Sequence, residues 1–168
     1  MQKALFLDRD GVINIDKSYL YKIEEFEFCD GIFELLNHAV KLGYLLFVVT
    51  NQSGIGRGYY SEADFLKLTD WMVKEFEKRE IPIQKVYYCP HHPNQKCNCR
   101  KPEAGMFLQA KREFDIDMKS SWMIGDKESD MTAAKKADIP NTVCINNNCK
   151  NAKYRVNSLF DIIDLIKK

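Results

Sequence analysis

Short apolar runs alternate with amphipathic stretches along this chain of 168 residues. Residues 4–7 are too few for a helix and predict a buried strand, and residues 44–49 form the continuous apolar run that is typical of a strand buried on both faces. Residues 86–88, 122–124 and 142–145 predict three more strands. We therefore expect five strands, with helices in the intervals between them.

Helical periodicity is present in the first two intervals. Apolar residues between positions 32 and 42 share one helix face, and Gly43 stands where a helix C-cap is expected. Ser61 and Asp64 resemble a capping box that begins a helix reaching about residue 79. These two stretches predict amphipathic helices that pack on a sheet.

The second half of the chain continues this alternation. Pro102 is suited to the first turn of a helix that runs to about residue 114, a short helix follows residues 125–126, and Ser158 caps a last helix. Strands that alternate with helices imply a parallel sheet with right-handed crossovers. The predicted fold is therefore α/β, with three layers and a Rossmann-like sheet, in one domain over residues 1–168. Residues 89–101 show neither the helical nor the strand pattern of apolar residues.

The composition narrows the choice of partners. The chain has 25 basic and 24 acidic residues, a net charge of +1, so no overall field favours nucleic acid or an anionic membrane. No apolar run reaches the length of a membrane span, and Asp8 interrupts the apolar run near the N-terminus, where a signal peptide would need it. We expect a cytoplasmic monomer that binds neither nucleic acid nor membrane.

The six cysteines fall into two groups. In a reducing compartment we expect no structural disulfides among them. Cys29, Cys144 and Cys149 are scattered and are interpreted as small core or surface residues. The other three gather near His91 in residues 89–101, which indicates a metal site.

Two aspartates end the first predicted strand. Residues i and i+2 of an extended chain face the same way, so Asp8 and Asp10 converge at the strand end, where Gly11 allows a sharp turn. Like charges this close are unfavourable unless a cation or a shared proton relieves them. A helix cap followed by a turn residue is the alternative interpretation.

A polar, glycine-rich segment follows the second predicted strand. Thr50 offers a hydroxyl and Asn51 an amide, and the glycines up to Gly58 allow backbone N–H groups to approach a ligand. This donor set suits a phosphate, although the segment lacks the Gly-Lys-Ser/Thr of a Walker loop. A flexible polar loop is the alternative.

Charged residues follow two further predicted elements. Lys101 could neutralise a transferring phosphoryl group, although an isolated Arg100-Lys101 pair also suits a solvated surface. Asp126 ends the fourth predicted strand and adds a third carboxylate, which favours Mg²⁺. We interpret Asp130 as a favourable helix-start charge, with a supporting carboxylate at the metal site as the alternative.

Taken in order, these segments resemble the four motifs of the haloacid dehalogenase-like (HAD-like) phosphatases over essentially the whole chain. The matching residues are Asp8-x-Asp10-Gly11, Thr50-Asn51, Lys101 and Gly125-Asp126. The resemblance implies phosphoryl transfer through an aspartyl-phosphate, with Asp8 as nucleophile and Asp10 as general acid and base. It also implies Mg²⁺ held by Asp8, the backbone carbonyl of Asp10 and Asp126, with Thr50 and Lys101 on the phosphate oxygens.

The cysteine-rich segment predicts a structural zinc site. Cys89, His91, Cys97 and Cys99 form a Cys₃His set, which closes a tetrahedral zinc site and leaves no open position for catalysis. His92 could replace His91, and reduced thiols without metal are the alternative. No interval between the motifs is long enough for a separate cap domain, so we expect an open site whose substrate is selected by loops, including the zinc loop 89–101.

Within the superfamily, the motifs and zinc loop resemble the D-glycero-D-manno-heptose-1,7-bisphosphate 7-phosphatases. That resemblance implies substrate contacts from Asp16, Lys17, Ser18, Tyr19, Thr50, Asn51, Gln52, Ser53, Arg100, Lys101 and Lys127. Arg100 is the expected partner of the distal sugar phosphate, because a guanidinium binds phosphate bidentately. The segment between His91 and Cys97 is short for this family, which leaves the preferred anomer open.

Three other functions remain as alternatives. Histidinol-phosphate phosphatases share the fold, the motifs and the zinc loop. A polynucleotide 3′-phosphatase shares the Thr-Asn-Gln pattern but fits poorly with the near-neutral charge and the zinc loop. A non-catalytic, zinc-stabilised binding module is the least favoured, since all four motifs are intact.

Overall fold

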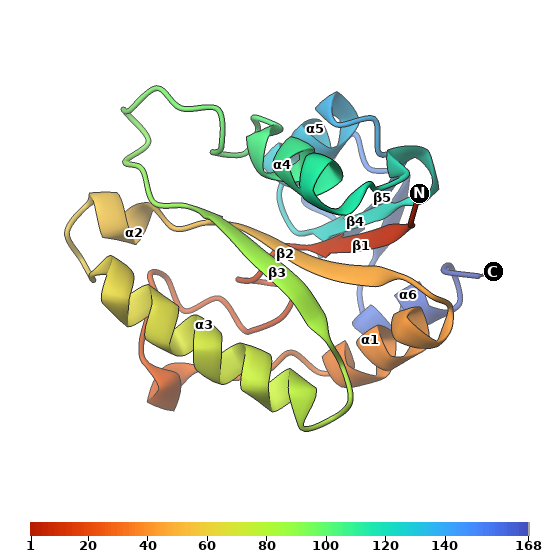
Figure 1. Cartoon of the computed structure of the whole chain (residues 1–168), viewed down its shortest axis with the longest axis horizontal. Coiled ribbons are helices and arrows are strands. Elements are labelled where there is room, and N and C mark those ends of the chain that lie inside the picture. Colours follow the sequence, from red (N-terminus) through yellow and green to blue (C-terminus); the bar gives the residue numbers. More distant parts are fainter. Residues whose placement is uncertain (168) are drawn as a thin grey trace.

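A parallel six-stranded sheet forms the centre of the molecule (Figure 1). The structure is a computed structural model that describes residues 1–167. The strand order is β3-β2-β1-β4-β5-β6. The strands are β1 (Ala4–Leu7), β2 (Leu45–Asn51), β3 (Ile83–Cys89), β4 (Trp122–Gly125), β5 (Asn141–Ile145) and β6 (Tyr154–Val156).

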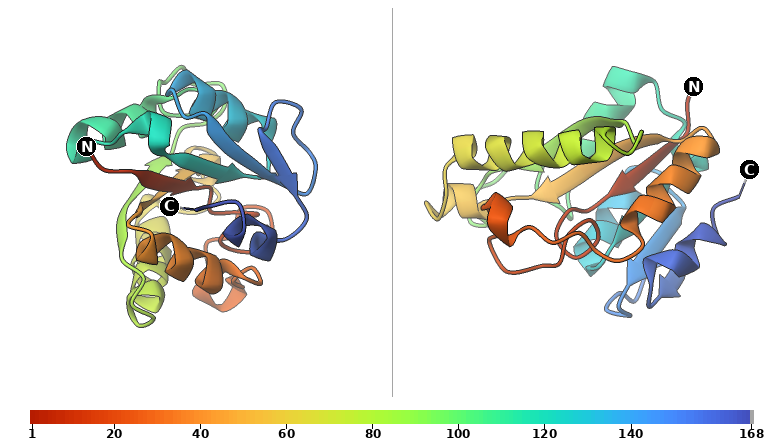
Figure 2. Two further views of the ribbon diagram at one scale, coloured as in Figure 1. Left: turned by 90° about the vertical axis from the view of Figure 1, so that its right-hand side faces the viewer. Right: turned by 90° about the horizontal axis from the view of Figure 1, so that it is seen from below.

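Helices cover both faces of this sheet (Figure 2). One face carries α1 (Ile32–Lys41), α3 (Glu62–Glu77) and α6 (Leu159–Ile163), and the other carries α4 (Gly105–Phe114) and α5 (Glu128–Lys136). The remaining elements are short: η1 (Ile23–Glu25), α2 (Ser53–Gly56) and η2 (Met118–Ser120). The predicted three-layer α/β fold with a parallel sheet is confirmed.

Alternation along the central strands produces two hydrophobic cores. In β1, Leu5 and Leu7 face the core shared with α1, α3 and α6, whereas Ala4 and Phe6 face the core shared with α4 and α5. All four side chains are completely buried. Because both faces of the sheet are buried, the sequences of β1 and β2 are continuous apolar runs.

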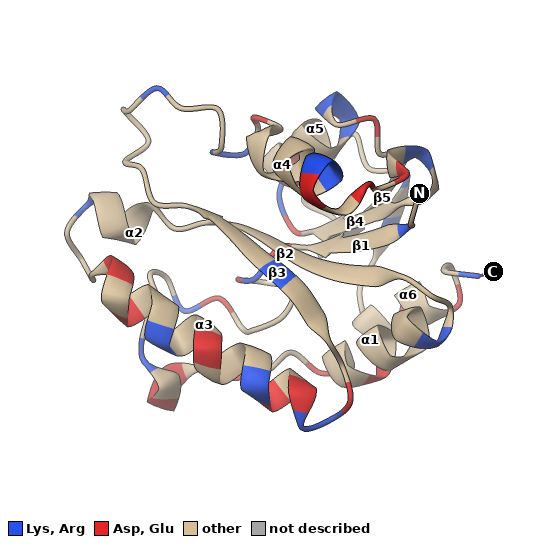
Figure 3. Cartoon of the chain, viewed as in Figure 1, with Lys and Arg blue, Asp and Glu red and all other residues tan. Residues whose placement is uncertain are grey.

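Charged side chains lie mainly outside these cores. Figure 3 shows acidic and basic residues interspersed along α3, whereas β1 and β2 carry none. Across the described part of the chain, no helix has both the length and the hydropathy that a bilayer crossing requires.

The N-terminal caps predicted for two helices are present. The capping box at Ser61 is present, since the Ser61 hydroxyl accepts a bond from the backbone of Asp64 and the Asp64 carboxylate accepts one from the backbone of Ser61. Ser158 caps α6 by accepting from the backbone N–H of Phe160. Both caps satisfy N–H groups that have no partner within the helix.

The predicted helix start at Pro102 is wrong. Helix α4 begins at Gly105, because residues 100–103 form a turn closed by a bond from the Glu103 N–H to the Arg100 carbonyl. Gly105 also lies against the preceding loop, where a Cβ would be 2.1 Å from the carbonyl oxygen of Asn98. The helix therefore begins where the chain leaves its contact with that loop. The residues around Pro102 in the sequence do not show this contact.

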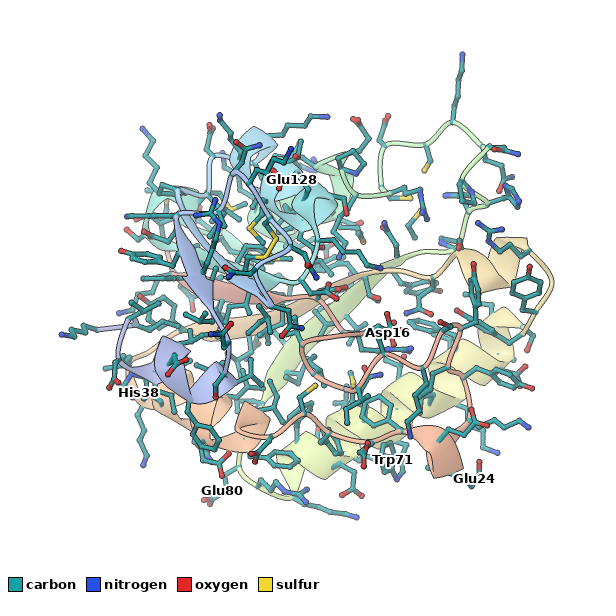
Figure 4. The ribbon with its side chains drawn as sticks, turned by 180° about the vertical axis from the view of Figure 1, so that it is seen from behind. Asp16, Glu24, His38, Trp71, Glu80 and Glu128 are labelled. Carbon is teal, nitrogen blue, oxygen red and sulfur yellow. A yellow bond between two sulfur atoms is a disulfide. The ribbon has the colours of Figure 1, made fainter. Side chains whose placement is uncertain are left out.

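Two further predictions need correction. Cys144 and Cys149 form a disulfide (Figure 4), because the loop after β5 returns Cys149 to a Cα–Cα distance of 6.1 Å from Cys144. The prediction of no disulfides is based on the expected cellular location of the protein. That location does not show which cysteines lie close together in the fold. The sheet has a sixth strand, β6, which was not predicted because it has three residues with a charged one at its centre.

Candidate active site

The predicted motifs meet at one edge of the sheet. Asp8 follows β1, Thr50 and Asn51 end β2, and Asp126 follows β4. Since all six strands are parallel, their carboxyl ends lie at the same edge, where open α/β sheets bind ligands. The loop after β3 brings Lys101 to the same place.

Lys101 joins two carboxylates in the protein interior. Its Nζ lies 2.9 Å from Oδ1 of Asp8 and 2.6 Å from Oδ1 of Asp130, and it donates to the carbonyl of Val49 at 2.8 Å. Lys101, Asp8 and Asp130 are all buried. A buried ammonium group requires such partners, and three acceptors surround this one.

The electrostatic balance of this cluster remains negative. Burial opposes the charge on Lys101, but the carboxylates of Asp130 and Asp8 outweigh that effect and raise the pKa of Lys101. Burial raises the pKa of Asp8 well above its usual range; Lys101 opposes this, and Asp130 and Asp126 add to it. Burial and Asp130 also raise the pKa of Asp126. A divalent cation would relieve this repulsion.

Three carboxylates could contribute to such a cation site. Asp8, Asp126 and Asp130 each offer an oxygen, and these atoms lie within 4.8 Å of one another. We call them the carboxylate cluster. Oδ1 of Asp130 pairs with Lys101, and Oδ2 accepts from the backbone N–H groups of Asp126 and Lys127 at 3.1 and 3.2 Å. In contrast, Oδ1 of Asp126 is buried and has no hydrogen-bond partner among the described residues.

This difference separates the roles of Asp130 and Asp126. Asp126 has a free, hard oxygen beside Asp8, which fits a Mg²⁺ ligand. Asp130 does hold the start of α5, but interpreting it only as a helix-start charge is wrong, because its other oxygen pairs with Lys101 in the interior. That pairing joins parts of the chain that are far apart in sequence.

Gly11 allows the backbone to pass directly beneath Asp126. Its φ is +91°, and a Cβ at this position would lie 2.2 Å from Oδ2 of Asp126. Any other residue would be strained and would displace the carboxylate. The glycine of the first motif therefore makes room for the Asp126 carboxylate as well as for the turn.

Asp10 lies beside the carboxylate cluster and is held by three donors. Oδ1 accepts from Nη2 of Arg9 at 2.9 Å and from Nδ2 of Asn14 at 3.0 Å, and Oδ2 accepts from Nε2 of Gln52 at 3.2 Å. Asp8 and Asp10 line one small cavity of about 50 Å³ together with Asn51, Lys101, Lys127, Ser129 and Asp130. The two aspartates converge as predicted, although β1 ends at Leu7 and the chain turns at Arg9, so strand alternation is not the reason.

Gln52 is itself fixed by two neighbours. Its Nε2 also donates to Oγ1 of Thr50 at 2.9 Å, and its Oε1 accepts from the hydroxyl of Tyr60. Gly54 makes room for that ring, because a Cβ there would lie 2.1 Å from a carbon of Tyr60. The orientation of Gln52, and hence of its bond to Asp10, is therefore determined by packing.

The small cavity adjoins a cleft of about 520 Å³, with which it shares the lining residues Asp10, Asn51, Lys101, Lys127 and Ser129. Asp10 lies on its wall, and the implied substrate residues found there are Asp16 (labelled in Figure 4), Ser18, Tyr19, Asn51, Gln52, Ser53, Arg100, Lys101 and Lys127. Two others do not line it. Lys17 donates to the carbonyl of Glu25 at 2.8 Å, and Thr50 is buried behind Gln52.

The cleft also contains residues that the sequence analysis did not select: Arg57, Tyr60, Pro102 and Ser129. Arg57 could have been identified, since it lies in the glycine-rich segment after β2. Its Nε donates to Oγ of Ser53 at 3.2 Å, and its guanidinium lies 5.7 Å from the ring centre of Tyr19.

Three cations of the cleft wall are not paired with a carboxylate. Within residues 1–167, Arg57, Arg100 and Lys127 have no acidic oxygen within 4.0 Å. Nη1 of Arg100 is buried and has no hydrogen-bond partner in the same range. The cleft therefore suits a second anionic group beyond the one that reaches Asp8.

The cysteine-rich loop forms a second cluster of potential metal ligands, which we call the thiol cluster. Ligand atoms of Cys89, His91, Cys97 and Cys99 lie within 4.8 Å of one another. Nδ1 of His91 is 3.3 Å from Sγ of Cys89 and 3.2 Å from Sγ of Cys99. Three sulfurs and one imidazole nitrogen at this separation fit a closed tetrahedral zinc site.

His91 and His92 have different surroundings. Nδ1 of His92 accepts from the backbone N–H of Asn94 at 3.1 Å, and the His92 N–H donates to the side chain of Gln95 at 2.7 Å. His92 thus belongs to a turn outside the thiol cluster, whereas His91 lies in it.

Asn51 connects the loop to the carboxylate cluster. Its Oδ1 accepts from the backbone N–H of Lys101 at 3.0 Å, and its Nδ2 donates to the Lys101 carbonyl at 3.1 Å. Gly56 lies against the other end of the loop, where a Cβ would be 2.4 Å from the backbone nitrogen of His92. The end of β2 and the zinc loop are therefore in direct contact.

Comparison with known proteins finds related sequences over the whole chain. A family model described as HAD-hydrolase-like matches residues 98–152. A D-glycero-alpha-D-manno-heptose-1,7-bisphosphate 7-phosphatase of Campylobacter jejuni is 56% identical, over 99% of this chain and 96% of that protein. A D-glycero-beta-D-manno-heptose-1,7-bisphosphate 7-phosphatase of Pasteurella multocida is 47% identical, over 99% of this chain and 98% of its own.

Solved structures show the same architecture. A D,D-heptose 1,7-bisphosphate phosphatase from B. bronchiseptica, complexed with magnesium and phosphate, has a TM-score of 0.86 at 24% identity over 97% of each chain. A putative HAD-like phosphatase from Mesorhizobium loti has a TM-score of 0.88 at 28% identity, over 97% of this chain and 85% of that one.

Proposed function

The chain belongs to the family of HAD-like D-glycero-D-manno-heptose-1,7-bisphosphate 7-phosphatases, and from this premise we propose that it hydrolyses the 7-phosphate of D-glycero-D-manno-heptose 1,7-bisphosphate through an aspartyl-phosphate. The product would supply the synthesis of a nucleotide-activated heptose. We also propose that the protein acts as a monomer in the cytoplasm.

One observation carries the proposal. Asp8 and Asp10 share a small cavity that adjoins a larger cleft, where three cations have no acidic partner within residues 1–167. The 7-phosphate would enter the cavity, and the 1-phosphate would remain in the cleft beside Arg100, Arg57 and Lys127. A substrate with two phosphates matches this distribution of charge.

In the first step, a carboxylate oxygen of Asp8 attacks phosphorus while the bond from phosphorus to the sugar oxygen breaks. Asp10 gives its proton to that leaving oxygen, so the sugar departs as an alcohol. In the second step, Asp10 takes a proton from water, which attacks the aspartyl-phosphate and releases inorganic phosphate and free Asp8. Lys101, which lies 2.9 Å from Asp8, would compensate the phosphoryl charge.

The proposed magnesium ligands are those that the family resemblance implies. We assign Mg²⁺ to Asp8, the backbone carbonyl of Asp10 and Asp126, and the unpartnered oxygen of Asp126 supports this assignment. When bound, Mg²⁺ reduces the repulsion between the carboxylate and the phosphate. Asp130 and Thr50 act through neighbours, by holding Lys101 and Gln52 respectively.

We assign zinc to the thiol cluster, in a structural role. Four protein ligands leave no position for substrate, so catalysis by this ion is not expected. Zinc would order a loop that has few apolar residues and would thereby hold Arg100 and Lys101 at the cleft.

A histidinol-phosphate phosphatase is the second candidate, since the carboxylate cluster would serve either substrate. The unpaired cations of the cleft favour a second anion over the ammonium group of histidinol phosphate.

Phosphate release from four substrates tests this assignment: the two heptose bisphosphate anomers, histidinol phosphate and a 3′-phosphorylated oligonucleotide. We expect Mg²⁺-dependent release from a heptose bisphosphate, at a kcat/KM at least about tenfold above the others. A preference for histidinol phosphate would overturn the substrate assignment. Absence of release from all four would overturn the enzyme assignment.

A further inference from the structure

Among the described residues, Arg9 is the largest completely buried side chain, at 1% exposed. It lies between the two aspartates of the proposed reaction, and that reaction gives it no role. Guanidinium groups stay protonated even when buried, so they require acceptors in the interior. The contacts of Arg9 therefore indicate what its charge is used for.

All side-chain hydrogen bonds of Arg9 come from one nitrogen. Nη2 donates to Oδ1 of Asp10 at 2.9 Å and to the carbonyl of Leu20 at 3.0 Å. Nε and Nη1 are buried and have no hydrogen-bond partner among the described residues. The guanidinium lies 5.9 Å from the ring centre of Phe65 in α3, which limits its movement on that side.

The backbone of Arg9 is also fixed. Its carbonyl accepts from the N–H groups of Val12, Ile13 and Asn14, at 3.2, 2.8 and 3.2 Å. The chain therefore winds tightly around Arg9, and the position from which the guanidinium extends cannot shift independently of this loop.

Leu20 ends a segment that contributes to the cleft wall. Ser18 and Tyr19 line the cleft and have φ values of +54° and +57°, a region that L-residues rarely adopt. Leu20 itself is 2% exposed. The bond from Arg9 to the Leu20 carbonyl thus holds the buried end of a segment with unfavourable backbone conformations.

We propose that Arg9 is a positioning residue for the general acid Asp10. The same nitrogen fixes the Asp10 carboxyl and the wall segment that ends at Leu20, so the proton donor and the surface that seats the sugar keep a constant separation. This inference rests on the proposed function, because it takes Asp10 as the group that protonates the leaving oxygen.

The proposal predicts a dependence on the leaving group. A sugar alkoxide is a poor leaving group and requires the proton of Asp10, whereas p-nitrophenolate leaves without protonation. Loss of Arg9 should therefore slow phosphoryl transfer from the sugar and leave transfer from p-nitrophenyl phosphate to Asp8 nearly unchanged. A general disturbance of the site would slow both reactions equally.

The experiment compares Arg9→Met, which keeps the apolar stem, with Arg9→Lys, which keeps one charged nitrogen. Phe65→Leu is the matched control, since Phe65 is also buried against the guanidinium but donates nothing to Asp10. Single-turnover rates are measured with heptose bisphosphate, and the p-nitrophenol burst is measured with p-nitrophenyl phosphate. We expect a loss of about 10²-fold with the sugar in Arg9→Met, a burst rate within about threefold of the unsubstituted enzyme, and partial recovery in Arg9→Lys.

Two outcomes would overturn the inference: a parallel loss of both rates in the Arg9 variants, or an unchanged rate with the sugar. If Arg9→Met does not fold, Arg9→Lys alone tests the inference. The lysine side chain is shorter, so we still expect a lower rate with the sugar substrate and an unchanged burst rate with p-nitrophenyl phosphate. A lack of reaction in the unsubstituted enzyme with both substrates would instead overturn the proposed function.

Discussion

The carboxylate cluster and the thiol cluster are built in opposite ways. Asp8 and Asp126 come from the ends of two neighbouring strands and are 118 positions apart, whereas the thiol cluster lies between Cys89 and Cys99. The carboxylate cluster rests on the central sheet and on the buried ammonium of Lys101. The thiol cluster lies in a loop without helix or strand beyond Cys89.

This difference determines what each metal would do. Strand pairing and ion pairs hold the carboxylates in place, so a cation there would contribute little to folding and would serve the proposed reaction instead. The loop around the thiol cluster has little other support, so its metal would carry the local stability. Lys101 and Asn51 connect the two regions, and damage to the loop should therefore reach the active site.

The largest effect is expected from Asp8→Asn. An amide cannot replace the nucleophilic carboxylate, so phosphate release should fall by about 10⁴-fold or more while the fold persists. Activity with Mg²⁺ and a thermal unfolding curve measure the two properties. Residual activity above a few per cent would mean that Asp8 is not the nucleophile.

Removing a ligand of the thiol cluster should reduce activity without unfolding the sheet. For Cys97→Ser we expect loss of one zinc per chain and about a 10²-fold loss of activity, because Lys101 loses its fixed position. Metal analysis and hydrogen exchange in residues 89–101 measure these changes. Cys29→Ser is the control, since this thiol lies outside the cluster. Unchanged activity after complete zinc loss would refute the coupling between the two regions.

Asp126 and Asp130 should respond differently to substitution within one cluster. Asp126→Asn should weaken Mg²⁺ binding about 10- to 100-fold with little loss of stability. Asp130→Asn should lower the free energy of unfolding by about 3 kcal/mol, because it leaves part of the Lys101 charge uncompensated, and should weaken Mg²⁺ less. Magnesium titration of activity and chemical denaturation distinguish these cases. Equal effects on both measurements would contradict the separation of roles.

The smallest effects concern two lysines near the cleft. Lys127 lines the cleft and has no acidic partner among residues 1–167, so Lys127→Ala should raise KM for the bisphosphate about threefold to tenfold. Lys17 donates to the carbonyl of Glu25 instead, so Lys17→Ala should leave KM within about twofold. A larger effect for Lys17 would show that this side chain turns toward the substrate.

The sequence predicted correctly those features that depend on neighbouring residues. It also predicted that residues at the ends of parallel strands lie close together. The apolar runs identified five strands, and the spacing of cysteines and His91 identified a loop whose ligand atoms do lie together. The position of Asp8 beside Asp126 followed from placing both at strand ends. Each of these inferences needs only neighbouring residues or the direction of the strands.

Features that depend on contacts between distant segments were missed. Nothing near Asp130 in the sequence shows that Lys101 would approach it, and nothing near Pro102 shows that the loop would delay the helix to Gly105. The implied contact of Lys17 came from resemblance alone, and that of Thr50 from its hydroxyl as well, but packing placed Lys17 outside the cleft and Thr50 behind Gln52.

The contacts of Asn51 and Gly56 divide the zinc loop into an anchored part and a variable part. The ends of the loop meet the end of β2 and helix α2, whereas residues 93–96 are exposed. Insertions or replacements in this outer arc would leave Lys101 in register. A change in the length of residues 93–96 should therefore be tolerated better than a change at either end of the loop.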